Sequence, residues 1–234
     1  MKCYNTGMED QIILIDKPAG ISSFGVVAKV RSRLKSEFGH KVKVGHTGTL
    51  DPFATGLLIL LTGKMTKKSN EFLKLDKVYE ATLKLGYTST TGDPEGEITK
   101  VPFSEHSEVF PTEKPSDSPE KDVSVISKIL ESFIGTIKQT PPKFSAIKIN
   151  GQRAYKLARK GQDFEIPSRE VEIYSIEIIS YNYPELKIRA HVSSGTYIRT
   201  LAEDIGKKLG TGAYLTTLRR TRIGKYDIKN AVML

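Results

Sequence analysis

The sequence is poor in cysteine and histidine and has no long hydrophobic run, and each scarcity excludes a class of protein. Its single cysteine, Cys3, cannot form an internal disulfide. Its four histidines are scattered, without HExxH spacing or cysteine pairs, so we expect no metal site. The longest aliphatic run, Leu57–Leu61, is far shorter than the roughly 20 residues of a membrane helix. The N-terminal residues also lack the apolar stretch of a signal peptide, so we expect a cytoplasmic protein without a membrane span.

Nucleotide-binding and hydrolase motifs are missing as well. The pair Gly63-Lys64 has Leu58 where a phosphate-binding loop would need its first glycine, and no G-x-G-x-x-G pattern occurs. The sequence neither excludes nor supports a catalytic Ser-His-Asp triad, because it lacks the G-x-S-x-G motif that holds the nucleophilic serine in many hydrolases.

Positive charge is in excess and is unevenly distributed. The chain has 36 Lys and Arg residues against 27 Asp and Glu residues, a net charge of +9. Much of the surplus lies in three stretches, at residues 29–43, 138–169 and 199–229. Such a field attracts polyanions, most commonly nucleic acid, but a basic surface that serves solubility would explain the charge equally well.

Hydrophobic patterning predicts an α+β fold with a mixed sheet, because strands dominate without a regular strand-helix-strand rhythm. The expected strands are residues 12–15, 57–61, 79–85, 169–180, 186–192 and 214–223. Ser22 or Ser23 should cap a first helix with the apolar face Phe24, Val27, Val30, Leu34 and Phe38. Further helices are expected near residues 66–73, 123–133, 154–159 and 197–209.

Two connecting segments have their own patterns. Residues 104–122 are acidic and rich in proline and serine, which predicts a mobile surface insertion. The pair Asn150-Gly151 predicts a hairpin turn. We expect the whole chain, residues 1–234, to form a single domain.

The most informative stretch is a glycine- and threonine-rich loop that holds one carboxylate. It reads Gly45-His46-Thr47-Gly48-Thr49-Leu50-Asp51-Pro52-Phe53-Ala54-Thr55-Gly56. Pro52 restricts the backbone of Asp51 to extended conformations. A carboxylate held in this way could be a nucleophile or a base, whereas Asp-Pro is more often a turn or a helix cap.

This loop resembles the signature G-x-L-D-P-x-A-T-G-x-L of the TruB-type family of pseudouridine synthases. Other blocks of this chain resemble the family's blocks in the same order, between about Ile12 and Gly224. Chance agreement of several ordered blocks is far less probable than a chance match to one short motif. They are residues 16–20 with Ser22-Ser23, residues 77–81, 91–96, 141–146 with the following Gly151, Arg153, Ala154, Tyr155, Ala158 and Arg159, residues 194–201, and residues 218–220 with Gly224.

The resemblance implies the pseudouridine synthase fold and its reaction. The expected fold is a central, mostly antiparallel mixed sheet flanked by helices, with an RNA-gripping thumb loop at residues 139–161. The expected reaction turns uridine 55 of the tRNA T-loop into pseudouridine by N1–C1′ cleavage, base rotation and C5–C1′ bond formation. It needs no cofactor. The expected partner is the T-arm of tRNA, with no protein partner, and the expected state is a monomer.

The same resemblance assigns roles to residues. Asp51 becomes the catalytic carboxylate, Tyr79 stacks on the base and helps to remove the C5 proton, and Arg199 pairs with Asp51. A larger set should contact RNA or support the site: His46, Leu218, Lys17, Pro18, Tyr197, Arg153, Arg159, Arg219 and Arg220. Without the resemblance, Tyr79 could be core packing and Arg199 could form a surface ion pair with Glu203.

One departure from the family and three competing functions follow. Bacterial members usually carry a C-terminal PUA domain, and only ten residues follow Gly224 here, so we expect none. The basic residues Arg219, Arg220 and Arg222 should then add to RNA binding. The competing functions are a tRNA-binding or tRNA-folding module without catalysis, a guide-dependent ribosomal RNA synthase, and a carboxylate hydrolase. No second catalytic acid stands out for a hydrolase.

Overall fold

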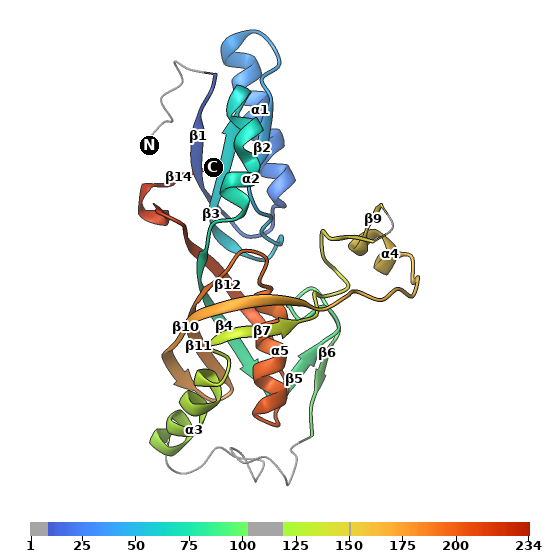
Figure 1. The fold of residues 1–234 in the computed structure, drawn as a ribbon, viewed down its shortest axis with the longest axis vertical. Helices are drawn as coiled ribbons and strands as arrows, with labels where there is room; N and C mark the ends of the chain where they lie inside the picture. The colour runs from blue at the N-terminus through green and yellow to red at the C-terminus, as the bar shows by residue number, and fades with distance from the viewer. Residues whose placement is uncertain (1–8, 103–118, 150) are drawn as a thin grey trace. The chain divides into compact units, whose positions relative to one another are not determined.

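The computed structural model describes residues 9–102, 119–149 and 151–234 (Figure 1). These residues form an α+β fold with a mixed sheet, as expected. They divide into two compact units. Unit 1 runs to Tyr79 and resumes at Leu218, and unit 2 is Glu80–Thr217. The chain passes between the two units within strands β4 and β12.

Unit 1 is built on the antiparallel pair β1 and β3. Ile12 of β1 faces Leu61 of β3, and the register continues to Lys17 opposite Gly56. The strand order is β14-β1-β3-β12, with β2 beside β3 and β13 beside β12. The pairs β1–β14 and β3–β12 are parallel, and the pairs β1–β3, β2–β3 and β12–β13 are antiparallel. The strands are β1 Ile12–Lys17, β2 Val44–His46, β3 Thr55–Thr62, β12 Ala213–Ile223, β13 Tyr226–Asp227 and β14 Val232–Met233.

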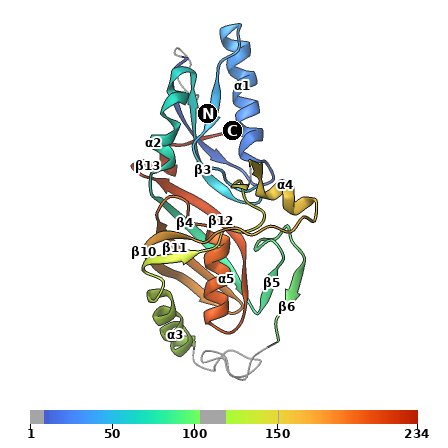
Figure 2. The same cartoon turned by 45° about the vertical axis from the view of Figure 1, so that its right-hand side comes forward.

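Strand β3 is apolar from Leu57 to Leu61 because both of its faces are covered. Leu58 and Leu60 pack with helix α1 (Ser23–Phe38), whereas Leu57, Ile59 and Leu61 pack with Phe72 of helix α2 (Ser69–Leu73). Figure 2 shows the two helices on opposite sides of β3. The 3-10 helix η1 (Gly63–Lys68) leads into α2, and η2 (Ile228–Asn230) precedes β14.

Helix α1 begins at one of the two predicted caps. Ser22 caps it by accepting a 3.0 Å hydrogen bond from the Gly25 amide, and Gly39 ends it with φ 74°. Its expected apolar face is wrong at Phe24, which is 66% exposed. Val26 packs in the core instead, and the Arg31 guanidinium lies 6.0 Å from the exposed Phe24 ring.

Unit 2 places its strands in the order β12-β4-β11-β10-β7. Residues of β4 alternate between buried and half-buried, as the sequence pattern predicts. Helix α3 packs against β10 and helix α5, and the β5–β6 hairpin lies beside α5 (Figures 1 and 2). The elements are β4 Lys77–Leu85, β5 Tyr87–Ser89, β6 Ile98–Lys100, α3 Pro119–Glu131, β7 Gly135–Gln139, β10 Arg169–Asn182, β11 Glu185–Val192 and α5 Ile198–Lys208.

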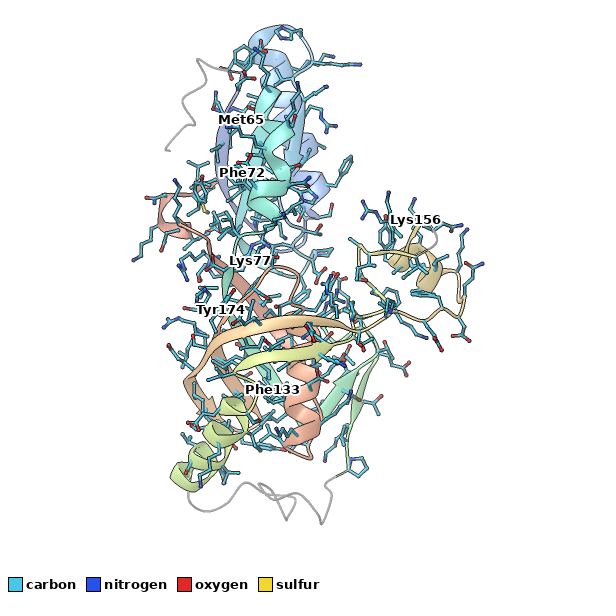
Figure 3. The ribbon with its side chains drawn as sticks, viewed as in Figure 1. Met65, Phe72, Lys77, Phe133, Lys156 and Tyr174 are labelled. Atoms are coloured by element: carbon cyan, nitrogen blue, oxygen red, sulfur yellow. The ribbon has the colours of Figure 1, made fainter. Side chains whose placement is uncertain are left out.

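The expected thumb contains a short hairpin and a helix. Strands β8 (Lys148–Ile149) and β9 (Gln152–Arg153) form the hairpin, and helix α4 (Ala154–Arg159) follows at the predicted residues. Figure 1 shows this segment extending away from the strands of unit 2. The exposed Lys156, labelled in Figure 3, lies on it.

The expected acidic insertion needs a correction at its end. Residues 104–118 lie outside the described part of the chain, but helix α3 already begins at Pro119. Proline suits the first turn of a helix, where its missing N–H leaves no bond unmade. Residues 119–122 are therefore helical, and Asp122 is buried.

Across the residues that the structure describes, no helix combines the length and the apolar character needed to cross a membrane.

Gly56 provides a test of how closely β3 and β12 approach each other. Its φ is +105°, and an added Cβ would lie 2.3 Å from the Arg220 carbonyl oxygen. We expect Gly56→Ala to lower the free energy of unfolding by roughly 3 kcal/mol or more, from backbone strain and overpacking together. Gly39→Ala is the matched control, because its φ is +74° but nothing lies within 4 Å of its added Cβ. It should cost about 1 kcal/mol. Equal shifts of the urea midpoint in the two variants would contradict this account of the approach.

Candidate functional site

Asp51 lies in unit 1 on the irregular segment between β2 and β3. The segment leaves β2 with the buried Thr47, whose amide donates to the Ile59 carbonyl at 3.1 Å. It turns at Pro52, where the Ala54 amide donates to the Asp51 carbonyl at 3.1 Å. Asp51 itself is half-buried. We call residues 47–55 the Asp51 loop.

The residue before Asp51 is held by a buried serine. The Ser23 hydroxyl donates to the Leu50 carbonyl at 2.9 Å and accepts from the Leu50 amide at 2.8 Å. One hydroxyl therefore satisfies both backbone groups of Leu50. The sequence suggested Ser22 or Ser23 as a helix cap; Ser22 is the cap, and Ser23 fixes the Asp51 loop.

The residue after Asp51 is held by the N-terminal block. The Pro52 carbonyl accepts from the Gly20 amide at 2.9 Å and from the Lys17 ammonium at 3.2 Å. Lys17 is fully buried, and its ammonium also donates to the carbonyls of Pro18 at 2.9 Å and Ile21 at 2.8 Å. This burial does not suit a direct contact of Lys17 with RNA, and the supporting role expected of Lys17 stays a prediction. Pro18 is exposed beside it.

Strand β12 presents its two consecutive arginines differently. Arg220 is 1% exposed: its Nε donates to the Leu57 carbonyl at 2.8 Å, and its Nη2 donates to the Gly48 carbonyl at 3.0 Å. The expected contact of Arg220 with RNA phosphates therefore does not fit. The Arg219 side chain is 41% exposed and forms a bidentate pair with Asp16, at 3.1 and 2.7 Å.

The other expected residues of unit 1 lie on its strands. Tyr79 on β4 is buried, and the Arg220 guanidinium carbon lies 6.0 Å from the centre of its ring. Leu218 on β12 is buried too, and His46 ends β2 half-buried.

Lys77, two residues before Tyr79, is a buried cation in the same unit (Figure 3). Its ammonium donates to the Leu73 carbonyl at 2.8 Å and also to the Leu75 carbonyl. Burial, and after it the nearby Arg220 charge, lower the pKa of Lys77 from 10.5 to about 8, while the Asp76 charge opposes the shift.

Arg199 in unit 2 is also buried, at 4% exposure of its side chain. Its Nη1 lies 3.2 Å from Asp93 Oδ2 and donates to the Thr91 carbonyl at 3.0 Å, and its Nη2 donates to the Phe144 carbonyl at 2.9 Å. A surface ion pair with Glu203, the alternative suggested by spacing alone, does not fit this burial.

Asp93 is a site residue that the sequence motifs did not single out. The second oxygen of this buried carboxylate accepts from the Thr91 hydroxyl at 2.6 Å and from the Glu95 amide at 3.0 Å. Its only sequence signal is the turn block at residues 91–96. Bonds to both oxygens offset the cost of burying the ion pair with Arg199.

The remaining expected residues of unit 2 are Tyr197, Arg153 and Arg159. The Gln139 side chain bonds both backbone groups of Tyr197, at 2.7 and 3.0 Å, where α5 begins. The Arg169 guanidinium carbon lies 5.0 Å from the centre of the Tyr197 ring. Arg153 and Arg159 are exposed on the thumb; Arg153 donates to the Ala146 carbonyl, and Arg159 lies 5.8 Å from the Tyr155 ring.

No group of three or more His, Cys, Asp or Glu side chains in the described part of the chain is arranged to hold a metal ion.

Family models cover nearly the whole chain. The model of the TruB family pseudouridylate synthase N-terminal domain matches residues 35–198, and that of the tRNA pseudouridylate synthase B C-terminal domain matches residues 199–234. The chain belongs to the TruB family. The resemblance seen in its sequence is thereby confirmed.

Relatives within the TruB family share nearly half of their residues with this chain. The tRNA pseudouridine synthase B of Phocaeicola vulgatus is 44% identical over 225 residues, which are 96% of this chain and 90% of that protein. Its counterpart in Flavobacterium johnsoniae is 44% identical over 227 residues, 96% of this chain and 93% of that protein. The Aquifex aeolicus protein of the same name is 43% identical and is covered to 72%.

Solved structures confirm the pseudouridine synthase fold. A chain of a Cbf5-Nop10-Gar1 complex matches 97% of this TruB-family chain with a TM-score of 0.67 and 29% identity. A chain of an H/ACA RNP bound to a substrate RNA containing 2′-deoxyuridine matches 96% of it with a TM-score of 0.64 and 26% identity. The TruB-family chain spans about half the length of these chains, 52% and 51%.

The lowered pKa of Lys77 predicts a pH-dependent stability. Between about 8 and the ordinary 10.5, the unfolded chain binds more protons than the folded one, so the free energy of unfolding rises with pH. The slope should approach 1.4 kcal/mol per pH unit. Lys77→Met should lack this rise in urea unfolding at pH 7 to 10, whereas Lys29→Met, at an exposed position of α1, should keep it. Parallel curves for wild type and Lys77→Met would contradict the assignment.

Proposed function

We propose that this TruB-family protein converts uridine 55 of the tRNA T-loop into pseudouridine, with Asp51 as the catalytic carboxylate. The observation that carries the proposal is the fixed backbone around Asp51. Ser23 holds Leu50 on one side, and Gly20 with Lys17 holds Pro52 on the other. A carboxylate on such a backbone is preorganised for reaction, which a turn residue does not require.

The reaction is an isomerisation that balances without a cofactor. The N1–C1′ bond breaks, the uracil turns, and a C5–C1′ bond forms, while C5 loses a proton and N1 gains one. An ionised carboxylate can take part by attacking the sugar or the base, or by removing a proton from the sugar. In each case Asp51 must stay ionised and keep its direction.

Tyr79 and Arg199 are proposed to complete the catalytic set. Tyr79 offers an aromatic face to the uracil and a hydroxyl that can handle the C5 proton. Arg199 would orient the Asp51 carboxylate by a charge-assisted hydrogen bond. The contacts of its guanidinium with Asp93, Thr91 and Phe144 fix the plane of that group in unit 2, which suits this role.

The remaining residues are proposed to serve RNA binding. A uridine inside a folded loop must leave its stack first, which costs a few kcal/mol. His46 would contact the RNA where the base leaves, Leu218 would line the uracil pocket, and Tyr197 would support it. Arg153, Arg159 and Arg219 would contact phosphates. The protein would act as a monomer in the cytoplasm.

A guide-dependent ribosomal RNA synthase is the second candidate, because chains of Cbf5 and H/ACA complexes share the fold. Their identity to this chain is 29% and 26%, against 44% for the Phocaeicola vulgatus tRNA pseudouridine synthase B. The higher identity favours the stand-alone tRNA enzyme.

Tritium release from a tRNA transcript labelled at uridine C5 tests the proposal. Wild type should release tritium from uridine 55, and Asp51→Asn should be slower by about 10³-fold or more. The control is Asp227→Asn, because Asp227 caps η2 and asparagine caps a helix equally well. This control should keep the wild-type rate.

Two results would overturn the proposed activity. Wild type that binds the transcript without releasing tritium would indicate a binding module. Wild type that neither binds it nor releases tritium would indicate a different RNA substrate.

The thumb cations predict a change in salt dependence. Arg153→Ala combined with Arg159→Ala should weaken tRNA binding and lower the slope of log K against log salt by about 1.5, since two phosphate contacts are lost. Filter binding at several salt concentrations gives the slope. Gln152→Ala changes another exposed residue of the thumb without changing charge, so it should leave the slope unaltered. An unaltered slope in the arginine double variant would remove these two residues from the RNA contacts.

A further inference from the structure

Arg220 is a buried cation that forms no ion pair within the described part of the chain. Among the described residues no carboxylate lies within ion-pair distance of it, although Arg219 and Arg222 have partners in Asp16 and Asp76. A guanidinium stays protonated even when buried, and burying it costs several kcal/mol unless its donors are bonded. The bonds that Arg220 makes therefore indicate why an arginine stands here.

Those bonds go to the two ends of the Asp51 loop. The Nη2 donates to the carbonyl of Gly48, near the start of the loop, and the Nε donates to the carbonyl of Leu57, just beyond its end. The planar guanidinium holds its donors in a fixed fork, so it sets the separation of the two carbonyls. Asp51 lies between them in the chain.

The backbone of the loop is shaped to lie against Arg220. In the parallel register of β12 and β3, Arg220 is opposite Gly56. Gly48 and Gly56 have φ values of +136° and +105°. An added Cβ would lie 3.6 Å from Arg220 Nη1 at Gly48 and 2.3 Å from the Arg220 carbonyl at Gly56. Residues with side chains rarely adopt such φ values, so both glycines permit the close approach.

The same guanidinium also faces Tyr79. Its central carbon lies 6.0 Å from the ring centre, within the range of a cation–π contact. Arg220 thus contacts the strand that carries one proposed catalytic residue and both ends of the loop that carries the other.

We infer that Arg220 is a positioning residue, which fixes the Asp51 loop and the Tyr79 ring for catalysis and does not bind RNA. The inference rests on the proposed function for its catalytic part. Its structural part, that Arg220 fixes the Asp51 loop, does not depend on which substrate the protein acts on.

Two measurements separate a positioning role of Arg220 from a direct contact with RNA. They are the rate of single-turnover tritium release and the affinity for tRNA. Arg220→Met should slow the rate at saturating tRNA by about 10²-fold, because small displacements of reacting groups cost that much. Its Kd for tRNA and its salt slope should stay within twofold of wild type. Arg220→Lys keeps the charge but cannot reach both carbonyls as a fork does, so it should recover only part of the rate. Arg219→Met should show the opposite signature, a raised Kd and a flatter salt slope.

Loss of stability alone is tested with Gly39→Ala, which weakens unit 1 at the end of helix α1, outside the Asp51 loop, and should keep the wild-type rate when folded. A normal saturating rate in Arg220→Met, with weakened and less salt-dependent binding, would overturn the inference in favour of an RNA contact. A rate loss in Gly39→Ala equal to that of Arg220→Met would reduce Arg220 to a fold-stabilising residue and would also overturn it.

Hydrogen exchange in Arg220→Lys gives a measurement that needs no substrate and tolerates a variant with little activity. The amides of Leu50 and Ala54, which are bonded within and around the Asp51 loop, should exchange faster than in wild type. The amides of β1 and β3 should keep their protection. Unchanged exchange at Leu50 and Ala54 would overturn the fixing of the loop.

If wild type releases no tritium, the proposed function fails, whereas the exchange measurement still decides whether Arg220 fixes the loop.

Discussion

A loop that leaves a sheet has backbone groups that no neighbouring strand can bond, and in this chain side chains bond them. Burying one of these groups without a hydrogen bond would cost more free energy than a typical hydrogen bond contributes to stability. Lys17 bonds the Pro52 carbonyl, Ser23 bonds both backbone groups of Leu50, and Arg220 bonds the carbonyls of Gly48 and Leu57. Each of the three belongs to a regular element, β1, α1 or β12. The direction of Asp51 depends on these bonds.

The same solution recurs in unit 2. Arg199, on helix α5, bonds the carbonyls of Thr91 and Phe144, which lie outside the regular elements. Gln139 bonds both backbone groups of Tyr197 where α5 begins. Polar side chains from helices and strands thus fix irregular backbone in both units, which is how a site gains precision that loops alone lack. The family's motifs are in large part the residues that make these bonds.

Local patterns were enough to predict most elements but few of the contacts. Helix α4 begins and ends at the predicted residues, and β4 shows the predicted alternation, because both depend on neighbouring residues. The ion pair of Arg199 with Asp93 joins residues 106 positions apart, and no spacing rule reaches that far.

Arg220 shows what the alternation of a strand adds to a sequence motif. The sequence suggested RNA binding for Arg219, Arg220 and Arg222 alike, whereas a strand turns successive residues to opposite faces. Arg220 therefore shares the buried side with Leu218, and Arg219 points the other way. The exposure of Phe24, in contrast, could not be predicted from local spacing. Helical spacing allowed it on the core face, and only the packing of Val26 decided that it stays exposed.

The kind of acceptor that each buried arginine uses gives the two units different sensitivities to substitution. Arg199 bonds a side chain, Asp93, which a single replacement can remove. Arg220 donates to the backbone carbonyls of Gly48 and Leu57, and every residue type carries that acceptor. Replacing a side chain of the Asp51 loop therefore leaves the acceptors of Arg220 in place. The clamp on the loop depends on one side chain, that of Arg220 itself.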